Sequence, residues 1–154
     1  MASTITATTL TVTISENVTI NGSQQGGSNI LTIGSVNEVF KRILTCPASV
    51  TTKILTYNAA VSGFAGAVQI DKVKYVRVTN LDDTNAIELA VVGAATLYQV
   101  TLAAGESHIL GSPEAAMLAE ADVSPSFGTM ADLASLQVNP AGNAVDVELF
   151  VASI

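Results

Sequence analysis

The side chains best suited to catalysis are few and scattered through the 154-residue chain. His108 is the only histidine and Cys46 the only cysteine. A hydrolytic triad or a structural zinc site needs several such groups together, and the sequence does not provide the partners. We therefore expect His108 to be an exposed strand residue, and Cys46 to be a small, buried apolar residue in a strand.

Paired carboxylates are the remaining route to catalysis, because glycoside hydrolysis needs only two of them. Two pairs stand close in the sequence, Asp82/Asp83 and Asp146/Glu148. The first pair lies in a predicted turn and the second on the polar face of a predicted strand, where solvated acids are expected. We therefore predict no catalytic residues, no cofactor and no resident metal, so that the chain is not an enzyme.

The turn from Asp82 to Asn85 allows two interpretations. Asp82, Asp83 and Asn85 place oxygen ligands close together, and calcium takes six to eight such ligands in flexible loops. The same residue types form turns by bonding to their own backbone. The sequence leaves both a calcium site and a simple turn open.

Alternation of apolar and polar residues dominates the chain, as in Thr9-Leu10-Thr11-Val12-Thr13-Ile14. This period of two is typical of half-buried strands built from β-branched residues. The pattern predicts an all-β domain, a β-sandwich or jelly-roll-like fold with at most one short helix. Strands are expected at 9–14, 17–20, 39–46, 53–57, 73–79, 87–92, 97–102, 107–110, 133–138 and 144–152.

The connections carry recognisable signals. Asn21-Gly22 predicts a tight turn, and Gly105 supplies the positive φ for another. The strands at 73–79 and 87–92 are expected to form a hairpin, and 63–66 to form a loop. Ser112 as N-cap and Pro113 at the first helical position predict a helix over 112–121.

The chain divides into an N-terminal arm (1–34) and a β-sandwich domain (35–154). In the arm, two strands precede the stretch from Ser23 to Asn29, which has no apolar residue and predicts an exposed loop. Adding a strand to an open sheet edge gives affinity through backbone hydrogen bonds. We therefore expect the arm to leave its own subunit and pair with a neighbour or with the larger particle to which the subunit attaches.

Charge and hydropathy narrow the range of partners. Charged residues make up 12% of the chain, against roughly 25% in a typical soluble domain. The net charge is −7 and all six basic residues lie between Lys41 and Arg77, which disfavours nucleic-acid binding. No apolar stretch is long enough for a membrane span, and the start lacks the features of an export signal. So few charges favour a surface covered by other chains, and we expect a homo-oligomer, a trimer above all.

Three stretches carry a resemblance to small virion structural proteins of marine tailed bacteriophages. They are SVNEVFKRILTCP (35–47), KVKYVRVTNLDDTN (72–85) and VTLAAGES (100–107), together with the closing AVDVELFVASI. The resemblance implies a non-enzymatic capsid decoration or cement subunit, which is assembled in the host cytoplasm, binds the major capsid protein on the outer virion surface and stabilises the particle. A neck or tail location, or a head- or tail-fibre module that binds a host receptor or carbohydrate, is the alternative. Aromatic residues are only 5% and tryptophan is absent, which disfavours carbohydrate binding.

Overall fold

The computed structural model describes residues 4–60, 68–120, 124–125 and 127–154. Within these ranges the chain is all-β, which confirms the predicted fold class, and no helix long and apolar enough to cross a membrane occurs. The predicted loop at 63–66 lies outside the described residues. The strands are β1 (Thr8–Ser15), β2 (Thr19–Ile20), β3 (Ser23–Gln24), β4 (Ser28–Val36), β5 (Glu38–Cys46), β6 (Thr52–Asn58), β7 (Val68–Gln69), β8 (Val73–Asn80), β9 (Ile87–Gly93), β10 (Leu97–Leu102), β11 (Ser107–Leu110), β12 (Leu133–Pro140) and β13 (Val145–Ser153).

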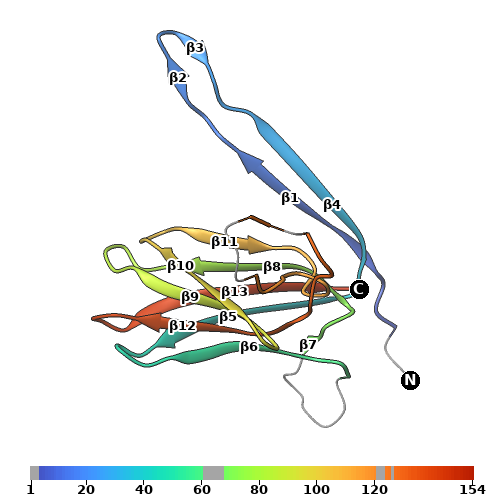
Figure 1. The fold of residues 1–154 in the computed structure, drawn as a ribbon. Coiled ribbons are helices and arrows are strands. Elements are labelled where there is room, and N and C mark those ends of the chain that lie inside the picture. The colour runs from blue at the N-terminus through green and yellow to red at the C-terminus, as the bar shows by residue number, and fades with distance from the viewer. Residues whose placement is uncertain (1–3, 61–67, 121–123, 126) are drawn as a thin grey trace.

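The sandwich is a jelly roll of two packed sheets (Figure 1). One sheet has the order β11-β8-β13-β5 and the other β10-β9-β12-β6-β7. Antiparallel pairs are nested along the chain, β5 with β13, β6 with β12, β8 with β11 and β9 with β10. Such nesting is what results when one long hairpin is rolled into two sheets.

The hairpin predicted from 73–79 and 87–92 is wrong, because β8 and β9 lie in different sheets. The chain crosses between the sheets after Asn80, whose buried Nδ2 donates to the carbonyl of Asn85 at 2.8 Å and to those of Leu102 and Ala103 at 3.1 Å. This amide fixes the crossing by bonding at once to the turn at Asn85 and to the end of β10, where the bond to Leu102 is buried.

The core lies between the two sheets and is made of aliphatic residues. Val78, Leu89, Leu136 and Leu149 have no exposed surface, and each comes from an alternating strand that turns its apolar side inward. Cys46 is packed among them as a free thiol, which confirms its expected role as a buried strand residue. Burial is the main cause that raises the pKa of this thiol, so it is held in its neutral form.

The arm is a long antiparallel hairpin of β1 and β4, with the short pair β2-β3 at its tip. The Asn21-Gly22 turn is confirmed, with φ angles of 51° and 78°. The loop predicted for 23–29 is wrong, since this stretch contains β3 and begins β4. Pairing across the hairpin decides this structure: the backbone of Glu16 donates to Gly27 at 2.8 Å, and a Cβ at Gly26 would overlap the carbonyl of Glu16.

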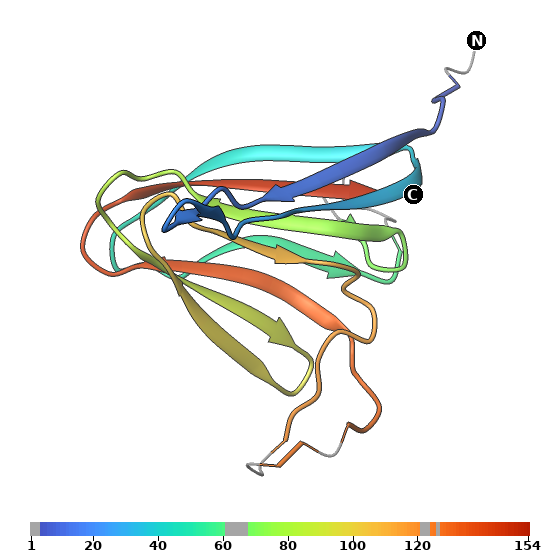
Figure 2. The ribbon, with the colours of Figure 1, turned by 90° about the horizontal axis from the view of Figure 1, so that it is seen from above.

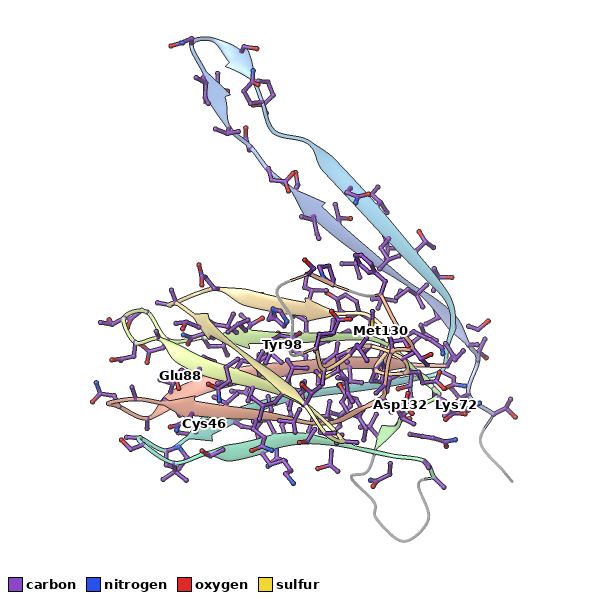
Figure 3. The ribbon with its side chains drawn as sticks, viewed as in Figure 1. Cys46, Lys72, Glu88, Tyr98, Met130 and Asp132 are labelled. Atoms are coloured by element: carbon purple, nitrogen blue, oxygen red, sulfur yellow. The ribbon has the colours of Figure 1, made fainter. Side chains whose placement is uncertain are left out.

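The helix predicted over 112–121 is also wrong in its described part. Ala115 has a φ of 47°, which no right-handed helix tolerates. Its backbone N–H donates to Asp132 Oδ1 at 2.9 Å. Met117 instead forms a two-way backbone bridge with Ala131 and buries its side chain in the core. Tertiary pairing therefore overrides the local capping signal. Figure 3 labels Asp132 where this segment returns to the sandwich.

The arm rises from one end of the sandwich, next to the C-terminus, and diverges from it toward the tip (Figure 1). Seen from above, the arm lies over the four-stranded sheet rather than beside it (Figure 2). The arm and the outer face of that sheet thus form two walls that meet at the base.

Candidate functional site

A groove of about 310 Å³ lies between β1 and the outer face of the four-stranded sheet. Residues 10–14 of β1 form one side. Tyr75, Arg77, Ile109 and Phe150 form the floor. Because consecutive β1 residues line it, both faces of the strand border the groove, which follows the edge of β1.

The apolar face of the arm follows from the register of its two strands. Leu10 pairs with Ile33 and Val12 with Leu31, and residues that pair directly across antiparallel strands point to the same side. At the base this face packs on a small second cluster around Tyr75, which meets Phe150 edge to face at 6.0 Å between ring centroids.

Above the base, the arm leaves its apolar side chains uncovered. Ile14 is 47% exposed and Leu31 is 51% exposed on the apolar face, and Ile30 is 62% exposed on the opposite face. Glu16 is the only charged residue among residues 1–34. Within the described part of the chain, β1 pairs with β4 alone, so its outer edge offers free backbone donors and acceptors to the groove.

A charge cluster borders the floor of the groove and includes Arg77 from the floor itself. Glu148 accepts from Arg77 Nη2 at 2.6 Å and forms an ion pair with Lys41 Nζ at 3.0 Å. The hydrogen bond from Lys41, and then that from Arg77, lowers the pKa of the Glu148 carboxyl below its usual 4.5. One carboxylate facing two cations gives this cluster a net charge of about +1 at neutral pH.

The predicted solvated acids behave differently from one another. Glu148 was expected to be solvated, but it is buried beneath its two cations, so that expectation is wrong. Asp146 is exposed and accepts from Thr45 Oγ1 at 2.6 Å. The difference arises because Glu148 lies opposite Ile43 and Thr79 in mid-sheet, whereas Asp146 lies near the start of β13.

The turn at 82–85 is closed by Asp82. Its Oδ1 accepts from the backbone N–H of Thr84 at 2.8 Å and of Asn85 at 2.6 Å, and from Asn85 Nδ2 at 3.0 Å. The Asn85 backbone bond is the main reason that the pKa of Asp82 is lowered. These bonds account for Asp82 as a turn former, and the described residues contain no group of three or more His, Cys, Asp or Glu placed to hold a metal ion.

His108 lies at the edge where the two sheets approach one another. Its Nε2 is 3.1 Å from the Tyr98 hydroxyl, and the two rings meet edge to face. His108 lies in a strand as expected, but it is half-buried rather than exposed, and burial lowers its pKa. With Tyr98 as its only side-chain hydrogen-bond partner in the described residues, it joins β10 to β11 across the open edge of the sandwich.

Sequence reasoning missed the groove because its two walls are far apart in the chain. The alternation of Tyr75 and Arg77 with buried valines in β8 marks an outward face, and the matching alternation of Leu31 and Ile33 marks a second arm strand. These signals were present, but only the packing of the arm against Tyr75 and Phe150 shows that the two faces meet.

Comparison with known proteins leaves the chain without an assigned family. No protein-family model and no curated protein matches the sequence. A chain of the Bacillus endospore appendages, a family of disulfide-linked pili, is similar in structure over 99% of this chain and 92% of its own length, at 8% sequence identity and a TM-score of 0.45. A likeness this distant carries no argument about function.

Proposed function

We propose that this chain is a non-enzymatic structural subunit of a larger protein assembly, to which it attaches through its arm. The observation that carries the proposal is a projecting hairpin with a single charged residue, Glu16, and a free strand edge above a largely apolar floor. A partner segment that extends along β1 would bond to its backbone and pack alternate side chains onto the floor, which is the chemistry of strand addition.

The edge strand β5 differs from β1 in how its free edge is protected against association. The outer edge of β5 is also free in the described structure, but β5 carries Glu38, Lys41 and Arg42. Charged side chains are a common means of preventing edge-to-edge association. β1, with the sequence TTLTVTIS, has no charge, no proline and no glycine, so nothing of this kind protects its edge.

The specific assembly we propose is the outer surface of a tailed-phage capsid, where the chain would bind the major capsid protein as a decoration or cement subunit. The sequence resemblance supports this assignment, and jelly rolls are a common fold of viral capsid domains. Because one fold serves many functions, the fold alone does not select this role. On this proposal the protein is found on the virion and has no cofactor, and its partners include neither nucleic acid nor membrane.

Two matched substitutions test whether the groove is the attachment site. Ile14→Lys places a charge in the groove, whereas Ile30→Lys places the same charge on the opposite face of the same hairpin. Each variant is added to particles prepared without this chain, and its occupancy is measured by co-sedimentation and quantitative mass spectrometry. We expect Ile14→Lys to lose attachment and Ile30→Lys to keep it.

Other outcomes would change the proposal. Equal loss in both variants would place the contact on the arm as a whole, and full occupancy in both would rule out the arm as the anchor. A chain that begins at Ser35 should stay folded but fail to attach. A copy number far below that of the major capsid protein would contradict a decoration role.

The low charge content leads us to propose a closed oligomer, a trimer above all, rather than a stable monomer. Light scattering on the purified chain measures this directly. A monodisperse species of 15.7 kDa would contradict it.

A further inference from the structure

We propose that the outer face of the five-stranded sheet, on the side of the sandwich away from the arm, holds a binding site for a neutral sugar. The site is a hollow of about 280 Å³ centred on Ala90, hereafter the Ala90 hollow. It is separate from the groove beneath the arm, and the inference does not depend on the proposed function. Figure 3 labels Glu88, which borders the hollow.

The hollow follows from the register of β9, β10 and β12. Gln99 and Gln137 pair with Ala90 from its two sides, and all three point to the same outer face. A single methyl group thus stands between two long amide side chains, which leaves space above it. One step along the sheet, Asn139 pairs with Glu88 and closes the hollow on its polar side.

The polar groups of the hollow have bonding capacity to spare. The Glu88 side chain is exposed and makes no ion pair. Neither this side chain nor that of Gln99 has a hydrogen-bonding partner in the described part of the chain. Asn139 Nδ2 is 3.5 Å from Thr51 Oγ1, and its Oδ1 is buried with no partner among the described residues. A buried acceptor left without a donor is costly, so a turn of the Asn139 amide toward the hollow, where a ligand or a water molecule can donate to it, would be favourable.

A sugar matches this set of groups better than other small ligands. Gln99 can donate and accept, and Gln137 keeps its Oε1 and one Nε2 proton beyond the 3.2 Å bond that it donates to Ser135 Oγ. The Glu88 carboxylate accepts, and Asn139 Oδ1 needs a donor. Neighbouring hydroxyl groups of a sugar supply both roles. None of the lining residues is basic, which disfavours phosphate or carboxylate ligands. The volume is about that needed for one or two sugar rings, near the lower limit for small-molecule sites.

The apolar part of the hollow takes the place of an aromatic platform. Val92 and Leu97 pair with each other on the same outer face, and Leu97 is 54% exposed. They offer a flat surface to the C–H face of a sugar ring. Tyr98 points to the other side of β10, toward His108, so the low aromatic content does not exclude a site built from aliphatic residues.

The test is a nitrogen–proton correlation NMR titration of the whole chain with the methyl glycosides of glucose, galactose, mannose and N-acetylglucosamine. At least one probe should cause saturable shifts in the side-chain amides of Gln99, Gln137 and Asn139. Ala90→Leu fills the hollow and should abolish these shifts. Glu88→Gln replaces a charged acceptor and should weaken binding about tenfold.

Thr101→Ala is the matched control, because Thr101 pairs with Glu88 on the same face but does not line the hollow. It should bind as the unmodified chain does. The inference is overturned if no probe shifts these amides, or if the shifts persist unchanged in both Ala90→Leu and Glu88→Gln. The spectrum of each variant reports whether it is folded, so loss of binding and loss of structure are distinguished.

Discussion

The arm and the sandwich are built from the same kind of sequence but differ in what covers them. β1 alternates threonine with leucine, valine and isoleucine, much as β8 alternates polar or aromatic residues with valine. Val78 has no exposed surface because a second sheet packs against it. Ile14 is half exposed because the arm diverges from the sheet beneath it. Alternation thus identifies a strand, but only the next layer decides whether its apolar face is buried.

The largest expected difference between the two regions is in amide hydrogen exchange. β1 and β4 have one partner each, whereas β8 and β13 lie inside a four-stranded sheet. Amides near the arm tip should therefore exchange by local opening, roughly 100-fold or more faster than those of β8 and β13. Mass-spectrometric exchange on the free chain measures this, and equal protection in both regions would show that they unfold as one unit.

A matched pair of truncations compares the two regions energetically. Leu149→Ala removes a fully buried side chain and should lower the free energy of unfolding by about 2–5 kcal/mol. Leu31→Ala makes the same change on the exposed part of the arm and should cost less than about 0.5 kcal/mol. Urea denaturation followed by circular dichroism gives both values. A large cost at Leu31 would mean that the arm is already covered in solution.

Glu148, in the charge cluster near the base of the arm, is expected to make a smaller contribution to the free energy of unfolding, and this contribution depends on pH. Because the pKa of Glu148 is lowered in the folded chain, its stabilising effect is present above about pH 4.5 and is lost as the pH falls through the folded-state pKa. Glu148→Gln should cost about 1 kcal/mol at neutral pH, since solvent reaches both cations, and should flatten the acid limb of the stability profile.

Removing the arm sharpens this prediction. Lys41 and Arg77 both belong to the sandwich, so the acid limb should be unchanged in a chain that begins at Ser35. If the limb disappears together with the arm, the arm must strengthen the two ion pairs by keeping water from them, because burial alone raises the pKa of Glu148.

The smallest expected effect lies at the edge where β10 and β11 approach one another. Burial lowers the pKa of His108 below 6.5, so the unfolded chain takes up a proton before the folded chain does. Stability should therefore fall slightly as the pH drops below about 6.5, and His108→Gln should remove that slope. Proton NMR of the His108 ring tests this, and an upward-shifted pKa would contradict it.

Local sequence signals predicted the sandwich strands well because their alternation is strong and their turns are short. Gly105 has the expected positive φ, and most strand positions agree within one or two residues. The failures share one cause. Ser112 and Pro113 fit a helix start, but bonds to Asp132 and Ala131 determine the structure. The polar tract at 23–29 likewise forms part of the hairpin near its tip because its backbone pairs across the arm. The groove and the hollow could not be predicted, because each depends on which strands pair with one another.

Nested pairing also sets the order in which the molecule can form during synthesis. β5 cannot complete its sheet until β13 exists, since Val39 pairs with Ala152, whereas Ser15 of the arm pairs with Ser28. A hairpin closes in about 1–10 μs, but at roughly 5–20 residues per second the ribosome needs on the order of ten seconds to reach Phe150, which forms part of the groove floor. During those seconds the floor of the groove is incomplete, so the nascent chain exposes the free edge of β1 before its own domain can cover the base of the arm. That interval is when arms of neighbouring chains on one polysome are free to meet.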